Sequence, residues 1–362
     1  MSNVARALPP APEAAVARVM VCDDSVVIRG AIARILESDP AIRVVARVGN
    51  GQLAIDELAR QAVDVVVLDI EMPVMDGLTA LPLLLRADPG LKVVVASTLT
   101  TRGADVALRA LRLGAADYLP KPTANGIAIG DGFRRELLAK VKGLARLRRA
   151  VAVPPRAAPL VQLRPAPLLP ARLLAIGSST GGPQALFTLV QALGTQLDVP
   201  VVLTQHMPPS FMPILAEHIG KLGALACAEA RDGELLRPGR IYLAPGDRHL
   251  LIHEAHGALQ ARLSSDSPEN FCRPAVDPML RSAAEACGGR VLVAMLTGMG
   301  HDGLAGTRRV IELGGAAVAQ DEATSVVWGM PGAVAQAGLC HAVLPLARIA
   351  PRLLDMLRMV RR

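Results

Sequence analysis

In the first third of this chain, short apolar segments each end in a carboxylate, hydroxyl or ammonium side chain. V-M-V-C runs into Asp23 and Asp24, V-V-V-L into Asp69, V-V-V-A into Ser97, and D-Y-L-P into Lys121. In an open parallel α/β sheet, residues just past the strand carboxyl ends converge on one crevice. Clustered carboxylates repel one another unless a hard cation neutralises them, and Mg²⁺ prefers such oxygen ligands. We therefore expect a metal-assisted pocket that handles a phosphoryl group.

Strand-like and helix-like segments alternate around these polar residues. Ser25 is a suitable N-cap for a helix that places Ile28, Ile32 and Leu36 on one face. Further strand-helix units follow at 42–61, 65–86 and 93–113, then a strand at 117–119 and a basic amphipathic segment at 131–149. This alternation predicts a doubly wound parallel sheet.

The pattern resembles the receiver domain of bacterial response regulators, and we assign residues 18–149 to such a flavodoxin-like domain. The resemblance implies Mg²⁺ as cofactor, phosphorylation by a sensor histidine kinase, and a set of roles. Asp69 would be the phosphoacceptor. The Mg²⁺ ligands would be Asp23, Asp24, Asp69 and the backbone carbonyl of Glu71, and the switch residues Ser97, Tyr118 and Lys121.

The composition allows two cores and argues against nucleic acid as the partner. Of 362 residues, 51% are hydrophobic and 20% charged, so the chain has enough apolar surface to fold. The formal charge is +7, but the basic residues are scattered and aromatics make up only 2%. Single-stranded nucleic acid binders interleave aromatic and basic residues. The charge therefore favours an acidic protein partner.

The cysteines and the amino terminus predict a cytoplasmic protein. Five cysteines are an odd number, and they form no C-x-x-C pair, which indicates reduced thiols. Prolines and a glutamate interrupt the first 13 residues, which makes them a poor signal peptide. No apolar run approaches the length that a membrane span requires, so no membrane insertion is expected.

A proline-rich segment divides the chain. Residues 1–17 are expected to be a flexible leader. Six prolines between 151 and 171 indicate a semi-rigid linker at 150–171. A second α/β domain, 172–362, follows, with apolar strands at 173–176, 200–204 and 291–296. Shorter strand-like pieces occur at 241–243, 249–253 and 316–319.

The second domain places a serine, a histidine and an aspartate after three of its strands. L-L-A-I runs into a glycine-flanked Ser179, V-V-L-T-Q into His206, and V-L-V-A-M-L into a glycine-rich turn that holds Asp302. A serine nucleophile needs a general base, and the base needs a carboxylate that orients it. Because strands and helix-length stretches recur along this half, we expect a Rossmann-like three-layer α/β domain. The order Ser, His, Asp differs from that of the α/β-hydrolases, which points to a triad on a fold distinct from theirs.

These segments look like the chemotaxis methylesterase, a receiver-regulated protein-glutamate methylesterase and glutamine deamidase. The matching motifs are I-G-S-S-T-G-G, T-Q-H-M-P-P, L-A-P-G-D-R-H, R-P-A-V-D, L-T-G-M-G-H-D-G and V-W-G-M-P, from Ile176 to Pro331. The resemblance implies that Ser179 is the nucleophile, His206 the base and Asp302 its orienter. Backbone N–H groups near Thr180 and Met299 would form the oxyanion hole.

The family's activity supplies further expectations. The substrates would be methyl-accepting chemoreceptors, demethylated and deamidated for sensory adaptation, and the hydrolase would need no cofactor. In the family, the unphosphorylated receiver covers the catalytic cleft. The chain departs from the usual motif residues at four positions, Ser178, Cys272, Ala275 and His301.

Several other interpretations remain open from the sequence. Asp247 and His249 in P-G-D-R-H could form a rival catalytic dyad, although a loop that lines the cleft is the preferred interpretation. His249, His253 and His256 superficially suggest a metal site, but their strand-like and turn-like spacing argues against a shared metal. A receiver-controlled docking module without turnover is the main functional rival. A DNA-binding regulator would need a helix-turn-helix domain, which 172–361 does not resemble. A chemosensory pathway unrelated to motility is a third alternative.

Overall fold

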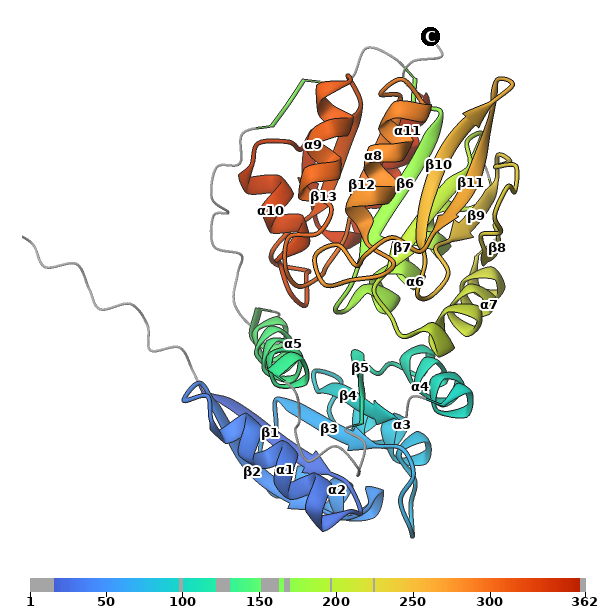
Figure 1. Cartoon of the computed structure of the whole chain (residues 1–362). Coiled ribbons are helices and arrows are strands. Elements are labelled where there is room, and N and C mark those ends of the chain that lie inside the picture. The colour runs from blue at the N-terminus through green and yellow to red at the C-terminus, as the bar shows by residue number, and fades with distance from the viewer. Residues whose placement is uncertain are drawn as a thin grey trace, which may run out of the picture.

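Two parallel sheets, one in each half of the chain, form the frame of the molecule (Figure 1). The computed structural model describes residues 16–97, 100–121, 131–150, 163–165, 170–195, 197–223 and 225–358. Most of the expected leader, 1–17, and of the expected linker, 150–171, lies outside these described residues.

The first domain is a five-stranded parallel sheet in the order β2-β1-β3-β4-β5. The expected helix cap is present, since the Ser25 hydroxyl accepts a hydrogen bond from the N–H of Ile28. The strands are β1 Ala17–Cys22, β2 Ile42–Val48, β3 Val65–Asp69, β4 Lys92–Ser97 and β5 Asp117–Pro120. The helices are α1 Val26–Glu37, α2 Gly51–Leu58, α3 Gly77–Ala87, α4 Thr101–Arg112 and α5 Asp131–Ala150.

The second domain contains a seven-stranded parallel sheet in the order β14-β13-β12-β6-β7-β9-β8. Its strands are β6 Leu173–Ser178, β7 Val201–Gln205, β8 Ala226–Glu229, β9 Arg240–Leu243, β12 Val291–Met295, β13 Ala316–Gln320 and β14 Ala342–Leu344. An antiparallel hairpin, β10 His249–Ala255 and β11 Ala258–Ser264, forms a separate two-stranded sheet. The helical segments are α6 Gly182–Leu193, η1 Pro209–Phe211, α7 Met212–Leu222, α8 Val276–Ala286, α9 Leu304–Glu312, α10 Met330–Gln336 and α11 Leu346–Arg358.

Alternation along the second sheet's strands divides its core between two faces, as a doubly wound fold requires. On β6, Leu173 and Ala175 belong to one buried cluster with α8, α9 and α10, whereas Leu174 and Ile176 belong to another with α6, α7 and α11. The three-layer α/β prediction is therefore confirmed. The piece predicted at 249–253 corresponds to β10. Its hairpin partner β11 and the edge strands β8 and β14 were not predicted from the sequence.

The two domains pack directly on each other, along β5, α4 and α5 of the first domain (Figure 1). The Tyr118 ring stacks on Phe211, with ring centroids 4.8 Å apart. Gln184 donates to the carbonyls of Leu111 and Ala115. The buried cluster that includes the α6–α7 face continues into the first domain, so the interface is an extension of a core.

Helix α5 provides a second strip of contact. Gly143 lies so close to the segment before α10 that an added Cβ would stand 1.9 Å from the carbonyl oxygen of Val326. Arg146 pairs with Glu322 at 2.7 Å and donates to the carbonyl of Ser325. The first domain therefore contacts both the start of α6 and a loop next to it.

Candidate active site

The first pocket lies at the carboxyl end of the first sheet and contains the predicted carboxylates. Asp23 and Asp69 are 1% and 2% exposed, while Asp24 is exposed. Ligand oxygens of these three residues all lie within 4.8 Å of one another. The Lys121 ammonium stands 2.6 Å from Asp69 Oδ2 and 3.1 Å from Asp23 Oδ2. The expected convergence of strand-end residues is thus present.

Burial and pairing act in opposite directions on the two charged groups at the centre of this pocket. Burial raises the pKa of Asp69, although the hydrogen bond from Lys121 opposes that shift. Burial would lower the pKa of Lys121, but its contact with Asp69 raises it instead. One ammonium thus faces a cluster of three carboxylates, and the remaining negative charge suits a divalent cation.

The other expected pocket residues lie around this centre. The N–H of Glu71 donates to Asp69 Oδ1 at 3.2 Å. The Ser97 hydroxyl donates to the carbonyl of Gly103 at 2.6 Å, and Ser97 also lines the small cavity beside Asp69. Tyr118 lies farther out, buried against the second domain.

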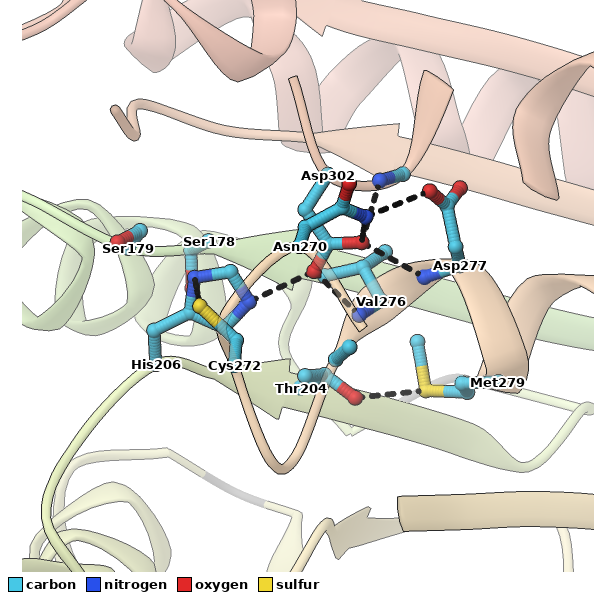
Figure 2. Close-up of polar contacts among 12 residues, drawn as sticks. Ser178, Ser179, Thr204, His206, Asn270, Cys272, Val276, Asp277, Met279 and Asp302 are labelled. Atoms are coloured by element: carbon cyan, nitrogen blue, oxygen red, sulfur yellow. Dashed lines mark hydrogen bonds and ion pairs between the residues drawn. The ribbon is translucent and has the colours of Figure 1, made fainter. Parts of the chain in front are cut away.

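The second site forms where β6, β7 and β12 end. His206 Nε2 lies 2.8 Å from Asp302 Oδ2 (Figure 2). Ser179, on the loop after β6, is held by its backbone, since its N–H donates to the carbonyl of Thr297 at 3.0 Å. No hydrogen bond joins the Ser179 hydroxyl to any residue of the described ranges, so the serine has not engaged the histidine in this conformation.

Gln205 fixes the serine and histidine loops relative to each other. Its amide nitrogen donates to the carbonyls of Ser179 and His206, at 2.9 and 3.0 Å. Its amide oxygen accepts from the Ser178 hydroxyl at 2.7 Å. Gly182 makes room for this side chain, because a Cβ there would stand 2.0 Å from the amide oxygen. Gln205 was not predicted as a site residue, although it immediately precedes His206.

Asp302 is held by donors from several segments. It is 2% exposed, and its carboxylate accepts from the N–H groups of Val276, Asp277 and Gly303 and from the side chain of Asn270. Burial alone would raise the pKa of Asp302, but its contact with His206 and these donors lower it. Asp302 is therefore held as an anion against the His206 imidazole, the arrangement expected of a carboxylate that orients a general base. Asn270 was not foreseen, since nothing in its sequence context marks it.

The remaining candidates have different surroundings. Thr180 is buried, and its carbonyl accepts from the Thr297 hydroxyl at 2.9 Å, while Met299 is 36% exposed. Both stay candidates for the oxyanion hole. Cys272, noted only as a departure from the motif, lies with its sulfur 3.5 Å from His206 Nδ1.

The rival sites are not assembled. Asp247 pairs with Arg273 at 2.7 Å, whereas His249 contacts the carbonyl of Ser267 and the N–H of Ala275. The Asp247–His249 dyad is therefore wrong. Within the described ranges, the only metal-like group of three or more side chains is that of Asp23, Asp24 and Asp69, so the histidine metal site is not supported. No helix in the described part of the chain is long and apolar enough to span a bilayer.

Comparisons with known proteins divide the chain in the same way. The profile described as "Response regulator receiver domain" matches residues 19–127, and that of "CheB methylesterase" matches 174–353. The crystal structure of the Thermotoga maritima CheB methylesterase catalytic domain aligns with a TM-score of 0.51 and 39% identity. The alignment covers 52% of this chain and 100% of that one.

Full-length relatives match as well. One from Paramagnetospirillum magneticum, named protein-glutamate methylesterase/protein-glutamine glutaminase 1, is 53% identical over 368 residues. That alignment covers 94% of this chain and 96% of the relative. A protein-glutamate methylesterase/protein-glutamine glutaminase from Azospirillum brasilense is 55% identical, with 92% and 91% covered. The chain therefore belongs to the CheB methylesterase family, with a receiver domain ahead of its methylesterase domain.

Proposed function

We propose that this chain hydrolyses the methyl esters of glutamate side chains, and the amides of glutamine side chains, in methyl-accepting chemoreceptors. Its biological role would be sensory adaptation in chemotaxis. The observation that carries the proposal is the His206–Asp302 pair at 2.8 Å beside the loop of Ser179, in a chain half identical to proteins named for this activity.

The chemistry follows from these three side chains. The Ser179 hydroxyl attacks the ester carbonyl carbon while His206 takes its proton, and the same proton then leaves with methanol. Water adds to the resulting acyl-enzyme by the same route and restores the serine and a free glutamate. Backbone N–H groups near Thr180 and Met299 are the proposed donors to the oxyanion. With glutamine as substrate, ammonia leaves in place of methanol.

We assign control of this activity to the receiver domain, residues 18–149, joined by the linker 150–171 to the catalytic domain, 172–362. Asp69 is the proposed phosphoacceptor, and Lys121 and Ser97 would contact the added phosphoryl group. The interface at Tyr118 supports inhibition by cover, because a change of the receiver surface there would loosen its contact with Phe211.

Mg²⁺ is the metal that suits the receiver pocket. Three carboxylates with oxygens within 4.8 Å face a single ammonium, which fits a hard divalent cation. The proposed ligands are Asp23, Asp24, Asp69 and the carbonyl of Glu71. A bound Mg²⁺ would supply positive charge that neutralises the phosphoryl group, and Lys121, which lies next to Asp69, would contact the phosphoryl oxygens. We propose no cofactor for the hydrolase.

The proposed partners follow from the two activities. A sensor histidine kinase would donate the phosphoryl group, and chemoreceptors would be the substrates. We propose that the protein acts in the cytoplasm, on the cytoplasmic side of those receptors. The five free cysteines agree with a reducing compartment.

The decisive experiment measures methanol release from methyl-esterified chemoreceptor membranes, with and without a small-molecule phosphodonor and Mg²⁺. Release that the donor accelerates supports both the esterase and its control. If the rate of methanol release does not depend on the phosphodonor, the esterase activity is supported and its control by phosphorylation is rejected. No release from folded protein in either condition rejects the proposed reaction. Deleting residues 1–150 should raise basal release, and a large fall would contradict inhibition by cover.

A further inference from the structure

Both ring nitrogens of His206 already have partners, and neither partner is the serine. Nε2 faces Asp302, as expected for a histidine held by a carboxylate. Nδ1 is then the nitrogen left to take the proton of Ser179, and it stands 3.5 Å from Cys272 Sγ (Figure 2). The His206 ring thus bridges Asp302 and Cys272, and the Ser179 hydroxyl contacts neither ring nitrogen.

The position of the Cys272 sulfur is fixed by a tight loop. Glu269 and Cys272 exchange backbone hydrogen bonds of 3.1 and 2.9 Å, which closes the loop between them. Asn270, inside it, donates to Asp302 at 2.9 Å. On the other flank, the Arg273 guanidinium is tied to Asp247 at 2.7 Å. The loop that carries the thiol is therefore anchored to the same carboxylate as the histidine.

We propose, on the basis of the function proposed above, that Cys272 is a positioning residue that keeps the catalytic base idle in the covered enzyme. Its sulfur contacts Nδ1 of His206, the ring nitrogen that would otherwise accept the proton of Ser179. The serine becomes a nucleophile only when Nδ1 leaves the sulfur and turns to the hydroxyl. The domain cover and the Cys272 contact are thus two separate restraints on one site.

The protonation state of the ring agrees with this geometry. Burial would lower the pKa of His206, but hydrogen bonds with Asp302 and Cys272 raise it to about 9. Asp277 lies behind Asp302, linked to it through Asn270. At neutral pH the ring is then an imidazolium, which has no lone pair for the serine proton. The nearby Arg273 is paired with Asp247, and His301 is exposed.

The first test compares pH profiles of kcat/KM for wild type, Cys272→Ala and Cys272→Ser in the full chain without phosphodonor. The substrate is methylated chemoreceptor membranes. Alanine removes the partner of Nδ1, so the rising limb should move down by about one pH unit, with about tenfold higher activity below it. Serine retains a hydrogen-bonding atom and should return the profile toward that of wild type. Cys227→Ala, on the edge strand β8, is the matched control and should leave the profile unchanged.

Two results would overturn the proposal. One is a Cys272→Ala profile that superimposes on that of wild type. The other is a folded Cys272→Ala protein that loses activity at every pH, because the thiol would then be needed by the base and would not restrain it. Circular dichroism of each variant separates that result from misfolding.

A second readout does not depend on esterase activity. Iodoacetamide alkylates a cysteine as sulfur displaces iodide, and a neighbouring imidazolium speeds the reaction by stabilising negative charge on sulfur. Mass spectrometry should therefore show slower labelling of Cys272 in His206→Asn than in wild type at pH 7, with added glutathione as the reference thiol. Equal rates would overturn the pairing. Histidine-dependent labelling in a protein that releases no methanol would support the pairing and reject the proposed substrate.

Discussion

The carboxylate of Asp117, in strand β5 of the receiver, accepts a hydrogen bond from the backbone N–H of Gly181, two residues after Ser179. The Oδ2 to N distance is 3.0 Å and the contact is buried. The same oxygen lies 3.3 Å from the ammonium of Lys140, which also donates to the carbonyl of Tyr118. The receiver thus holds the N-cap residue of α6, the helix that follows the proposed nucleophile.

Weakening this contact should activate the covered enzyme. Asp117→Asn keeps the size of the side chain but replaces a charge-assisted hydrogen bond with a neutral one. We expect basal methanol release to rise by about threefold to tenfold, and the further gain from a phosphodonor to shrink. Asp56→Asn, an exposed substitution on α2, is the control and should change neither rate. Basal release at the wild-type level in folded Asp117→Asn would show that the contact does not restrain the site.

Removing Ser179, the proposed nucleophile, should abolish the reaction but not the fold. Ser179→Ala loses the attacking oxygen, and by analogy with other serine triads the rate should fall by on the order of 10⁶. Because the Ser179 hydroxyl makes no hydrogen bond to the described part of the chain, the free energy of unfolding should stay nearly constant. Methanol release and urea denaturation measure the two quantities. Near-normal esterase activity in Ser179→Ala would mean that another group attacks the ester.

Mg²⁺ should stabilise the receiver through its acidic cluster. A ligand that binds only the native state at 100 times its dissociation constant adds about 2.7 kcal/mol to the free energy of unfolding. Asp24 is the exposed member of the cluster, so Asp24→Asn removes a ligand without leaving a buried partner unpaired. Urea denaturation with Mg²⁺ or with a chelator should show a gain in wild type and a smaller gain in the variant. Equal gains would place the metal elsewhere.

The raised pKa of His206 also predicts how stability depends on pH. A group whose folded pKa exceeds its unfolded value stabilises the fold fully below the unfolded pKa and loses that effect as pH rises through the folded pKa. For His206 the window runs from 6.5 to about 9. The loss across it should approach about 3 kcal/mol, at 1.36 kcal/mol per unit. Urea denaturation at pH 6 and pH 9.5 should reveal this fall in wild type and a much smaller one in His206→Gln.

The strands and the strand-end residues were predictable because their signals are local. An apolar run followed by a polar residue gives both the strand and its chemistry, and parallel pairing then brings Asp23, Asp69 and Lys121 together. The same rule predicts that His206 and Asp302 lie close together, and they are in contact although 96 positions separate them in the sequence. The edge strand β8 escaped notice because A-C-A-E has neither a long apolar run nor a clear alternation.

The supporting residues were not predictable, because their roles arise from contacts between distant segments. Asn270 lies in a polar loop of no special pattern, yet it joins Asp302 to Asp277. In the sequence, Asp117 is indistinguishable from an ordinary strand residue. Its hydrogen bond with the N–H of Gly181 forms only because the two domains pack together. Cys272 differs from the expected motif, but the direction of its sulfur depends on the loop closed by Glu269.

That loop also exposes an aromatic ring beside the site. Phe271 is fully exposed, with a relative exposure of 104%, in a chain that has only four phenylalanines. Its φ is +62° and that of Asn270 is +53°, a left-handed backbone that is costly for a phenylalanine. Such strain persists where the surrounding structure imposes it, and it concentrates at functional sites. Phe271 is thus presented to solvent next to Asn270 and Cys272, which contact Asp302 and His206.

We therefore expect Phe271 to contact the protein substrate and to take no part in the chemistry. Phe271→Ala should raise KM for methylated chemoreceptors by about threefold to tenfold, the effect of losing about 1 kcal/mol of contact, with kcat nearly unchanged. Hydrolysis of a small methyl ester should not change, because such a substrate does not reach the ring. Phe271→Gly should show the same KM effect with higher thermal stability, since glycine adopts the left-handed backbone without strain. Steady-state kinetics on both substrates separates docking from catalysis, and a fall in kcat on the small ester would place Phe271 among the residues that shape the site.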